Sequence, residues 1–139
     1  MLYIVLNNHL ALCSKQQIMD IQNTQSQMRK GVLEFCILSI IQQGEVYPSD
    51  IVDKMKAANM HILEGTLYPL LTRLKNAGLL NYRWVESVTG PPRKYFVMTE
   101  EGNAAFAVLL KTWNEMAGAV NTLTQVANPI SSTEATEAL

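Results

Sequence analysis

The residues whose types and spacing could carry out a chemistry lie on one side of the stretch from Glu64 to Asn76. Leucines recur in this stretch at helical spacing, which predicts an amphipathic helix with one apolar face. The other side and its flanks carry hydroxyl, amide and cationic groups, and no carboxylate follows Glu64. These groups belong to Thr66, Tyr68, Thr72, Arg73, Lys75 and Asn76. They suit base edges and phosphates in a nucleic-acid groove, although such a helix face is often simply solvated.

The two ends of this helix are predicted from their residue types. Thr66 is the expected N-cap, which would place Pro69 where a backbone amide has no partner within the helix. Gly78 follows the last apolar residue of the pattern and is expected to end the helix.

The charge balance of the chain permits nucleic-acid binding without requiring it. The 139 residues form a chain of one-domain size with a formal net charge of −1. Between Met28 and Thr99, nine lysines and arginines stand against six acidic residues, so this part has a net charge of +3. The basic character is milder than that of a strongly basic nucleic-acid binder.

No constellation for enzyme catalysis or metal binding is visible in the sequence. The two histidines, His9 and His61, have no catalytic acid–base partner or glycine-rich phosphate loop beside them. The two cysteines, Cys13 and Cys36, have neither metal-ligand spacing nor a disulfide pattern. The sequence also lacks the pattern of a signal peptide or of a membrane-spanning stretch. We therefore expect a cytoplasmic protein that is not an enzyme and has no cofactor or metal.

Two further helices are predicted before the Glu64–Asn76 stretch. Apolar residues surround nearly the whole circumference of residues 28–43, which indicates a helix that is buried on several sides and ends at Gly44. A shorter helix begins at Pro48 and is expected to end near Ala58. The connection over residues 59–63 has room for one β-bridge. Two short amphipathic helices joined in this way outline a helix-turn-helix.

A β-hairpin is predicted directly after the helix-turn-helix. Residues 79–86 alternate, with Leu80, Tyr82 and Trp84 on one face. Residues 87–92 are dense in turn formers, and residues 93–98 are expected to form the second strand. Arg93 and Lys94 would then follow the hairpin tip at once. These features predict the wing of a winged helix, lying along the phosphate backbone or the minor groove of DNA.

A long helix is predicted to start after Thr99, its expected N-cap, and to run to about Val126. Apolar residues recur along it at alternating spacings of three and four, which is an a/d seam. They are Phe106, Leu109, Trp113, Met116, Val120 and Leu123. At its rise per residue the helix would be about 40 Å long, which exceeds what one small domain can cover. The seam is therefore expected to form a homodimer, with a helix folded back on its own core as the alternative.

The predicted fold is mainly α with a small β-hairpin. Residues 28–99 are assigned to a winged helix-turn-helix DNA-binding domain and residues 100–127 to a dimerisation helix. Residues 1–27 are expected to be a poorly ordered arm with a possible helical lead-in near its end, and residues 128–139 a flexible tail. Met19 and Met28 are alternative starts of the chain.

Five short motifs together resemble the PadR family of bacterial transcriptional regulators. In chain order they are Gly65-Thr66-Leu67-Tyr68-Pro69, Arg73-Leu74, Gly78-Leu79-Leu80, Pro91-Pro92-Arg93-Lys94-Tyr95 and Thr99-Glu100-Glu101-Gly102. The resemblance spans about Met28 to Leu123, and a single helix after the wing is similar to the short subfamily. It implies a homodimer with a winged helix-turn-helix, usually a repressor, whose repression is often relieved when a small aromatic compound binds. It also makes Met19 the expected native start.

The resemblance implies roles for particular residues. The implied DNA-binding residues are Thr66, Tyr68, Thr72, Arg73, Asn76, Arg93 and Lys94. Thr66 and Tyr68 would touch the DNA backbone. Thr72, Arg73 and Asn76 would lie nearest base edges or flanking phosphates. Arg93 and Lys94 would contact DNA from the wing. A packing role for Tyr68 and a surface ion pair for Arg73 remain alternatives.

The resemblance also implies a binding site between the two copies of the last helix. In the short subfamily such sites bind planar, often cationic, aromatic molecules, and the residues that would line one here are Phe106, Leu109, Trp113 and Met116. Interface packing is the default interpretation of Trp113. The competing function for the whole chain is a winged helix that binds protein without DNA. Pairing of the wing cations with Glu64 and Glu86 would favour that function.

Overall fold

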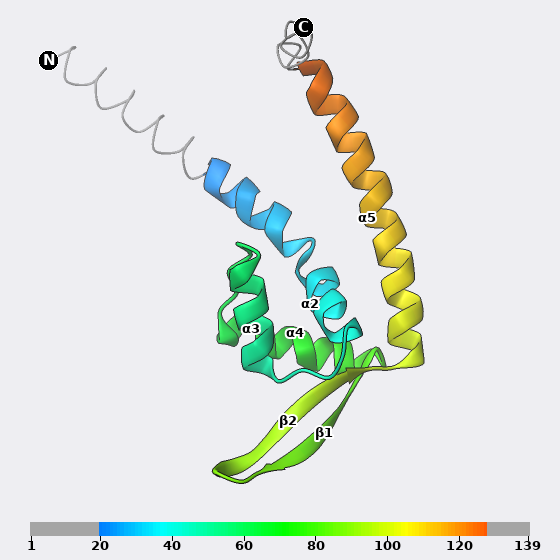
Figure 1. The fold of residues 1–139 in the computed structure, drawn as a ribbon. Helices are drawn as coiled ribbons and strands as arrows, with labels where there is room; N and C mark the ends of the chain where they lie inside the picture. Colours follow the sequence, from blue (N-terminus) through cyan, green and yellow to red (C-terminus); the bar gives the residue numbers. More distant parts are fainter. Residues whose placement is uncertain (1–19, 128–139) are drawn as a thin grey trace, which may run out of the picture.

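The computed structural model describes residues 20–127, so the predictions for the start of the arm and for the tail lie outside the described residues. Residues 20–30 are helical, and a turn at Gly31 and Val32 separates them from α2 (Leu33–Gln42). The single helix predicted over residues 28–43 is therefore wrong. The amide of Val32 bonds to the Arg29 carbonyl three residues back, which interrupts the helical ladder beside the flexible Gly31. The two segments run in different directions (Figure 1).

The second helix, α3 (Pro48–Ala57), forms as its sequence predicts. Its N-cap is Tyr47, whose amide donates a hydrogen bond to Asp50 Oδ2 at 3.2 Å, and Pro48 occupies the first turn. Asn59 ends it with a φ of +58°, close to the predicted end at Ala58. The β-bridge lies before α3, between Val46 and Phe96, and not in residues 59–63 as predicted. This bridge ties the start of α3 to the hairpin.

The third helix of the core, α4 (Glu64–Asn76), begins three residues earlier than a Thr66 cap allows. Its N-cap is Leu63, whose carbonyl accepts the amides of Thr66 and Leu67. Thr66 therefore lies in the first turn, and Pro69 lies within the helix, where its missing amide leaves the Gly65 carbonyl without the usual helical donor. The predicted N-cap is thus wrong, because backbone geometry alone caps this end.

The other end of α4 confirms the prediction for Gly78. Gly78 has a φ of +80°, and its amide bonds to the Lys75 carbonyl while the Leu79 amide bonds to the Leu74 carbonyl. This pair of hydrogen bonds is a Schellman motif, which requires a left-handed residue that glycine adopts without steric cost. The chain then turns directly into the first strand.

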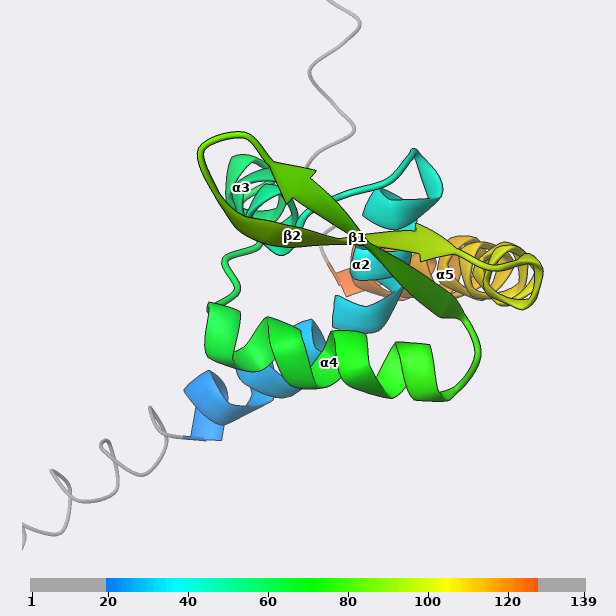
Figure 2. The ribbon, with the colours of Figure 1, turned by 90° about the horizontal axis from the view of Figure 1, so that it is seen from below.

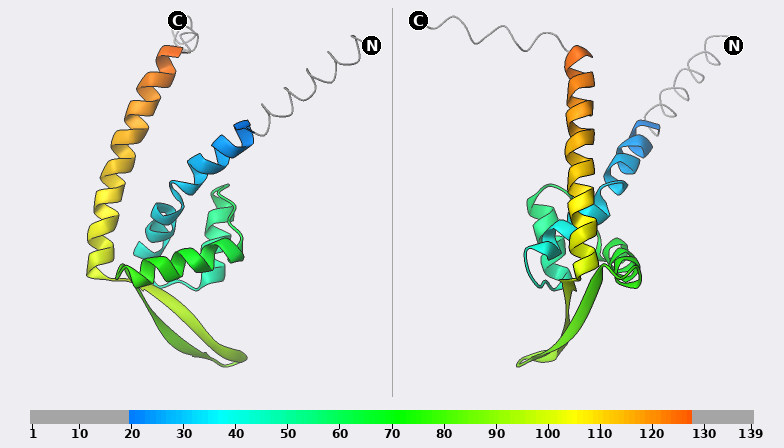
Figure 3. Two further views of the ribbon diagram at one scale, coloured as in Figure 1. Left: turned by 180° about the vertical axis from the view of Figure 1, so that it is seen from behind. Right: turned by 90° about the vertical axis from the view of Figure 1, so that its right-hand side faces the viewer.

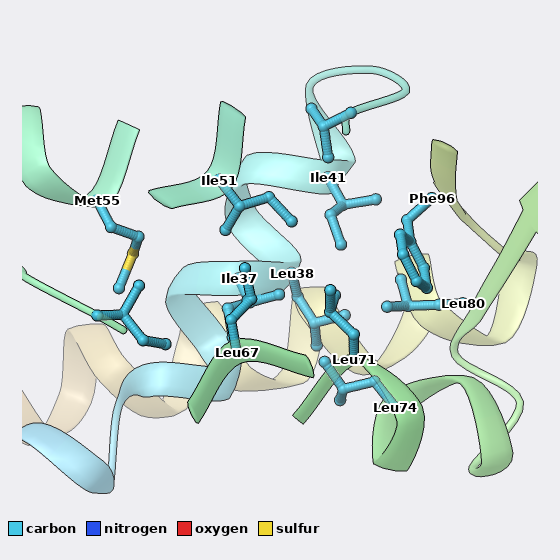
Figure 4. Packing of buried hydrophobic residues seen from close by; sticks show 12 residues of the cluster. Ile37, Leu38, Ile41, Ile51, Met55, Leu67, Leu71, Leu74, Leu80 and Phe96 are labelled. Atoms are coloured by element: carbon cyan, nitrogen blue, oxygen red, sulfur yellow. The ribbon is translucent and has the colours of Figure 1, made fainter. Parts of the chain in front are cut away.

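The three helices and the base of the hairpin share one apolar core (Figure 4). Its fully buried residues come from every one of these elements: Ile37, Leu38, Ile41, Ile51, Leu67, Leu71 and Leu80. Each such side chain contributes about 1.5–3 kcal/mol by leaving water. The core therefore fixes α4 with its leucines inward and its polar side outward, as the leucine spacing predicts.

The hairpin consists of β1 (Leu80–Ser87) and β2 (Gly90–Met98), which pair antiparallel. Val88 and Thr89 form the tip, so Pro91 and Pro92 lie in β2 and not in the turn as predicted. A bulge between Val85 and Ser87 accommodates the prolines, which cannot donate to the strand ladder. Arg93 pairs with Val85 and thus lies partway along the strand, away from the tip. The hairpin projects from one end of the domain (Figure 3).

The last helix, α5 (Glu100–Ala127), is 28 residues long and extends away from the domain (Figures 1 and 3). Thr99 caps it as predicted: its hydroxyl donates to the Gly78 carbonyl at 2.7 Å and accepts the Gly102 amide at 2.9 Å. Two turns later, Phe106 stacks on Phe35 of α2 with 5.6 Å between ring centroids. No helix within residues 20–127 is long and apolar enough to cross a membrane. The predicted fold, a winged helix-turn-helix followed by a long helix, is confirmed.

Candidate nucleic-acid interface

The polar side of α4 and the hairpin lie next to each other at one end of the molecule (Figure 2). All five residues of α4 that were predicted to bind DNA are exposed: Thr66, Tyr68, Thr72, Arg73 and Asn76. Their exposure follows from the core, because the buried Leu67, Leu71 and Leu74 occupy the opposite side. The structure therefore presents these groups on one accessible surface.

Two of these residues keep hydrogen-bonding capacity on the exposed surface. Burial raises the pKa of Tyr68 above its ordinary value, and the nearby Tyr47 and Glu64 add to the effect. The phenol is exposed and protonated at neutral pH, so it can donate to a phosphate oxygen. The Thr72 hydroxyl donates to the Tyr68 carbonyl at 3.0 Å, which leaves its lone pairs free to accept.

Arg73 is held by an ion pair, the alternative that the sequence leaves open for it. Its Nε donates to Glu34 Oε1 at 2.6 Å, which joins α4 to α2. The side chain is still 68% exposed, so the pair is a surface pair of small energy. Part of the Arg73 charge is nevertheless compensated inside the protein.

The two wing cations point to opposite faces of the hairpin, because they are consecutive in one strand. Lys94 lies over the Tyr82 ring, with its Nζ 3.7 Å from the ring centroid. Arg93 lies over the Tyr47 ring at 5.3 Å, on the face toward α3. On that second face, Arg83 makes a double hydrogen bond to Glu45 and lowers the pKa of that carboxyl. One face of the hairpin is thus anchored to the body of the domain.

The Lys94 face of the hairpin adds Tyr82 and Trp84, to which the sequence assigned no site role, and Lys75, which the sequence placed on the polar side of α4 but not among the DNA-binding residues. Lys75 of α4 reaches the same Tyr82 ring, with its Nζ 5.4 Å from the centroid, and Trp84 is 62% exposed beside it. The signal for Lys75 was present, because it lies seven residues after Tyr68 and therefore on the same flank of the helix. The signal for Tyr82 was absent, because its proximity to α4 depends on the tertiary structure.

The wing cations are free of the acidic partners that would favour a protein-binding function. Within residues 20–127, ion pairs join Arg73 to Glu34, Arg83 to Glu45 and Lys111 to Glu115. Neither Glu64 nor Glu86 pairs with a wing cation in this part of the chain. The cations on the Lys94 face thus remain available to an external anion.

The four residues of the predicted ligand site lie along one side of α5. Phe106 and Leu109 are half-buried against α2, whereas Trp113 and Met116 are 41% and 49% exposed. Trp113 also approaches Phe35, with 6.4 Å between ring centroids. The first part of the seam, Phe106 and Leu109, therefore packs on its own domain. The upper part, from Trp113 onward, is uncovered. Within residues 20–127, Trp113 and Met116 are thus open to solvent and not enclosed in a pocket.

Comparisons with known proteins agree with this architecture. The model of the transcriptional regulator PadR-like family matches residues 37–108. The chain is 50% identical to a PadR-like transcription factor from Bacteroides fragilis, with a TM-score of 0.62 over 73% of this chain and 98% of that one. It is 39% identical to a PadR-like transcriptional regulator from Bacillus cereus, with a TM-score of 0.65 over 71% and 97% of the two chains.

A more distant structure shares the fold. PadR of Bacillus subtilis, solved in complex with operator DNA, is 24% identical and has a TM-score of 0.53 over 57% of this chain and 46% of that one. The family match covers the helix-turn-helix, the hairpin and the start of α5, which are the elements that build the surface described above. The chain therefore belongs to the PadR-like family of transcriptional regulators.

Proposed function

We propose that the protein binds double-stranded DNA as a homodimer and represses transcription from the operator it occupies. The observation that carries the proposal is the juxtaposition of the polar side of α4 with Lys94 of the wing on one exposed surface. In this arrangement Thr72 and Asn76 would face the base edges of the major groove, and Thr66, Tyr68 and Lys94 would contact phosphates. The operator complex of Bacillus subtilis PadR supports DNA as the partner.

The proposed roles of the arginines differ from those of the lysines. Arg73 would contact DNA only with the part of its guanidinium that Glu34 leaves free. Arg93 lies on the hairpin face that is anchored to the body of the domain, opposite to the face that carries Lys94. Both would therefore contribute less than Lys94.

The homodimer is supported by the uncovered upper part of the α5 seam. Trp113, Met116, Val120 and Leu123 are between 41% and 72% exposed in the single chain. A row of large apolar side chains on one side of a helix is covered in a stable protein, and a second α5 in two-fold symmetry covers it with its own row. The two α4 helices would then read two half-sites of a pseudo-palindromic operator, about 34 Å apart.

A planar aromatic effector would bind between the two α5 helices, where the symmetry-related Trp113 side chains approach each other. Phe106, Leu109 and Met116 would extend this site along the seam. An effector that favours a different separation of the α5 helices would alter the spacing of the α4 helices and weaken operator binding. The proposed regulator thus couples ligand binding to repression through one interface.

Lys94→Ala is expected to weaken binding to every DNA sequence alike, because a phosphate contact carries no sequence information. The slope of log affinity against log salt concentration should fall by about 1. Fluorescence anisotropy with DNA from upstream of the protein's own coding region, and with a scrambled duplex, measures both effects. Lys111→Ala is the matched control, because it removes the same charge from α5, where Lys111 pairs with Glu115. Equal slopes for the two variants would contradict the wing assignment.

Trp84→Phe is expected to allow a clean test of the effector site, because the chain contains only two tryptophans and the variant leaves Trp113 as the sole indole. Planar aromatic cations should then quench or shift the Trp113 emission and release operator DNA in the same concentration range. The reciprocal variant Trp113→Phe, with Trp84 as its only indole, should show neither effect at those concentrations. An unchanged Trp113 emission across a panel of such compounds would remove the proposed site.

A further inference from the structure

Lys75 of α4 and Lys94 of the wing converge on a single aromatic ring, that of Tyr82. The Lys94 Nζ lies 3.7 Å from the ring centroid and the Lys75 Nζ lies 5.4 Å from it. Lys94 also lies 5.3 Å from the Phe96 ring and 6.0 Å from the Trp84 ring. We call Lys75, Tyr82, Trp84 and Lys94 the Tyr82 cluster. It joins two elements that are separate in sequence and that both face the proposed DNA.

The aromatic rings favour the ordering of the two lysine side chains before any ligand arrives. An ammonium group over the face of an aromatic ring is attracted by the ring quadrupole. A free lysine side chain has many rotamers, and fixing it on binding reduces affinity. Lys94 is half-buried in the cluster, although lysine is seldom buried. Tyr82 thus orders these lysine side chains in part before a phosphate binds, which lowers the entropy cost of binding.

The same arrangement places two lysine ammonium groups at one aromatic ring. Within the described residues, the three ion pairs involve neither Lys75 nor Lys94. The positive charge of both side chains is therefore available to an external anion. A phosphodiester is the anion that a duplex would present between a helix in its groove and a wing on its backbone.

We propose that Tyr82 is a positioning residue that holds Lys75 and Lys94 as a two-lysine site for one stretch of the DNA phosphate backbone. The inference rests on the proposed DNA-binding function and adds the residues that fix the wing relative to α4. The aromatic ring of Tyr82 attracts the two ammonium groups, and the Tyr82 hydroxyl is not needed for this attraction. Binding of this stretch of the backbone by both lysines would keep α4 and the wing at one separation along the duplex.

The test compares Tyr82→Leu with Tyr82→Phe in the full chain. Tyr82 is 37% exposed, so leucine fills much of its volume and removes the quadrupole, whereas phenylalanine keeps the ring. Tyr82→Leu is expected to weaken binding to the upstream duplex about threefold to tenfold, since it removes the ring from under two cations. Tyr82→Phe is expected to bind within about twofold of the wild type, because phenylalanine retains the cation–π attraction.

The salt dependence separates positioning from a loss of structure. Tyr82→Leu should reduce the slope of log affinity against log salt, as Lys75→Ala and Lys94→Ala do, while its thermal unfolding and its mass in solution stay unchanged. The double variant Lys75→Ala, Lys94→Ala should lose less affinity than the product of the two single losses, because each single change already breaks the shared contact. Tyr95→Leu, on the opposite face of the hairpin, is the matched control and should keep the wild-type slope.

Three outcomes would overturn the proposal, two of them without affecting the DNA-binding function. If the wild-type protein binds DNA and Tyr82→Leu binds with the same affinity and salt slope, the two-lysine site is refuted and DNA binding stands. Independent, multiplicative losses for Lys75→Ala and Lys94→Ala would refute it in the same way. If the wild-type chain shows no salt-dependent binding to either the upstream or the scrambled duplex, the DNA-binding function fails and the Tyr82 site fails with it.

Discussion

Replacing Met116 and Val120 together by glutamate is expected to convert the protein to monomers and to abolish specific operator binding. Both side chains are 49% exposed in the single chain and lie one helical turn apart on the α5 seam. In a two-fold dimer the change would bring four carboxylates into an apolar interface. Burying an unpaired charge costs several kcal/mol, so the dimer should dissociate at least about 100-fold more readily.

The matched control for this variant lies on the other side of the same helix. Gly118→Glu with Thr122→Glu introduces the same two charges at the same spacing, and nothing lies within 4 Å of a Cβ added at Gly118. Light scattering should report a dimer for the control and a monomer for the seam variant. Gel retardation should show specific operator binding only for the control. A dimeric seam variant would mean that another surface joins the two copies, and the proposed effector site would then have no basis.

Gly102→Ala is expected to destabilise the whole domain, although it adds only one methyl group. Gly102 is buried in the first turn of α5, where an added Cβ would overlap the Leu79 carbonyl oxygen and lie 2.7 Å from Met98 Sδ. The overlapping atom belongs to the backbone at the start of β1, so the helix as a whole would have to move. We expect a loss of about 3 kcal/mol or more in the free energy of unfolding.

Thermal unfolding followed by circular dichroism measures this effect. A loss of that size should lower the melting temperature by about 10 °C or more in a domain of this length. Gly118→Ala is the control on the same helix, where an added Cβ meets open space. It should stabilise the helix by up to about 1 kcal/mol, because alanine favours the helical backbone over glycine. If Gly102→Ala melted like the wild type, the tight crossing of α5 over the strand would not exist in solution.

The position of Gly102 also explains the motif Thr99-Glu100-Glu101-Gly102, for which the sequence alone offers no structural reason. Thr99 both caps α5 and bonds to the Gly78 carbonyl, while Gly102 allows α5 to approach the neighbouring backbone at Leu79. Two short motifs that are far apart in the sequence thus form one junction. This junction sets the direction in which α5 leaves the domain, and hence where a second copy would pack.

The local predictions that failed concern the places where backbone geometry replaced a side chain. Thr66 has the residue type of a cap, yet Leu63 in an extended conformation starts α4 without any side-chain bond. Pro91 and Pro92 have the residue type of a turn, yet a bulge takes them into β2. In both cases backbone hydrogen bonding and strand register set where the element begins, and residue type alone does not reveal either.

The element types, the apolar face of α4 and the seam of α5 follow from the order of residues, because helical and strand periods are properties of the chain that need no partner. The partners of the cations depend on the fold. Arg73 pairs with Glu34, Arg93 lies over the Tyr47 ring, and Lys75 and Lys94 both lie over the Tyr82 ring. These contacts join residues from different elements, and the distance between such residues depends on how the elements pack and not on the order of residues along the chain.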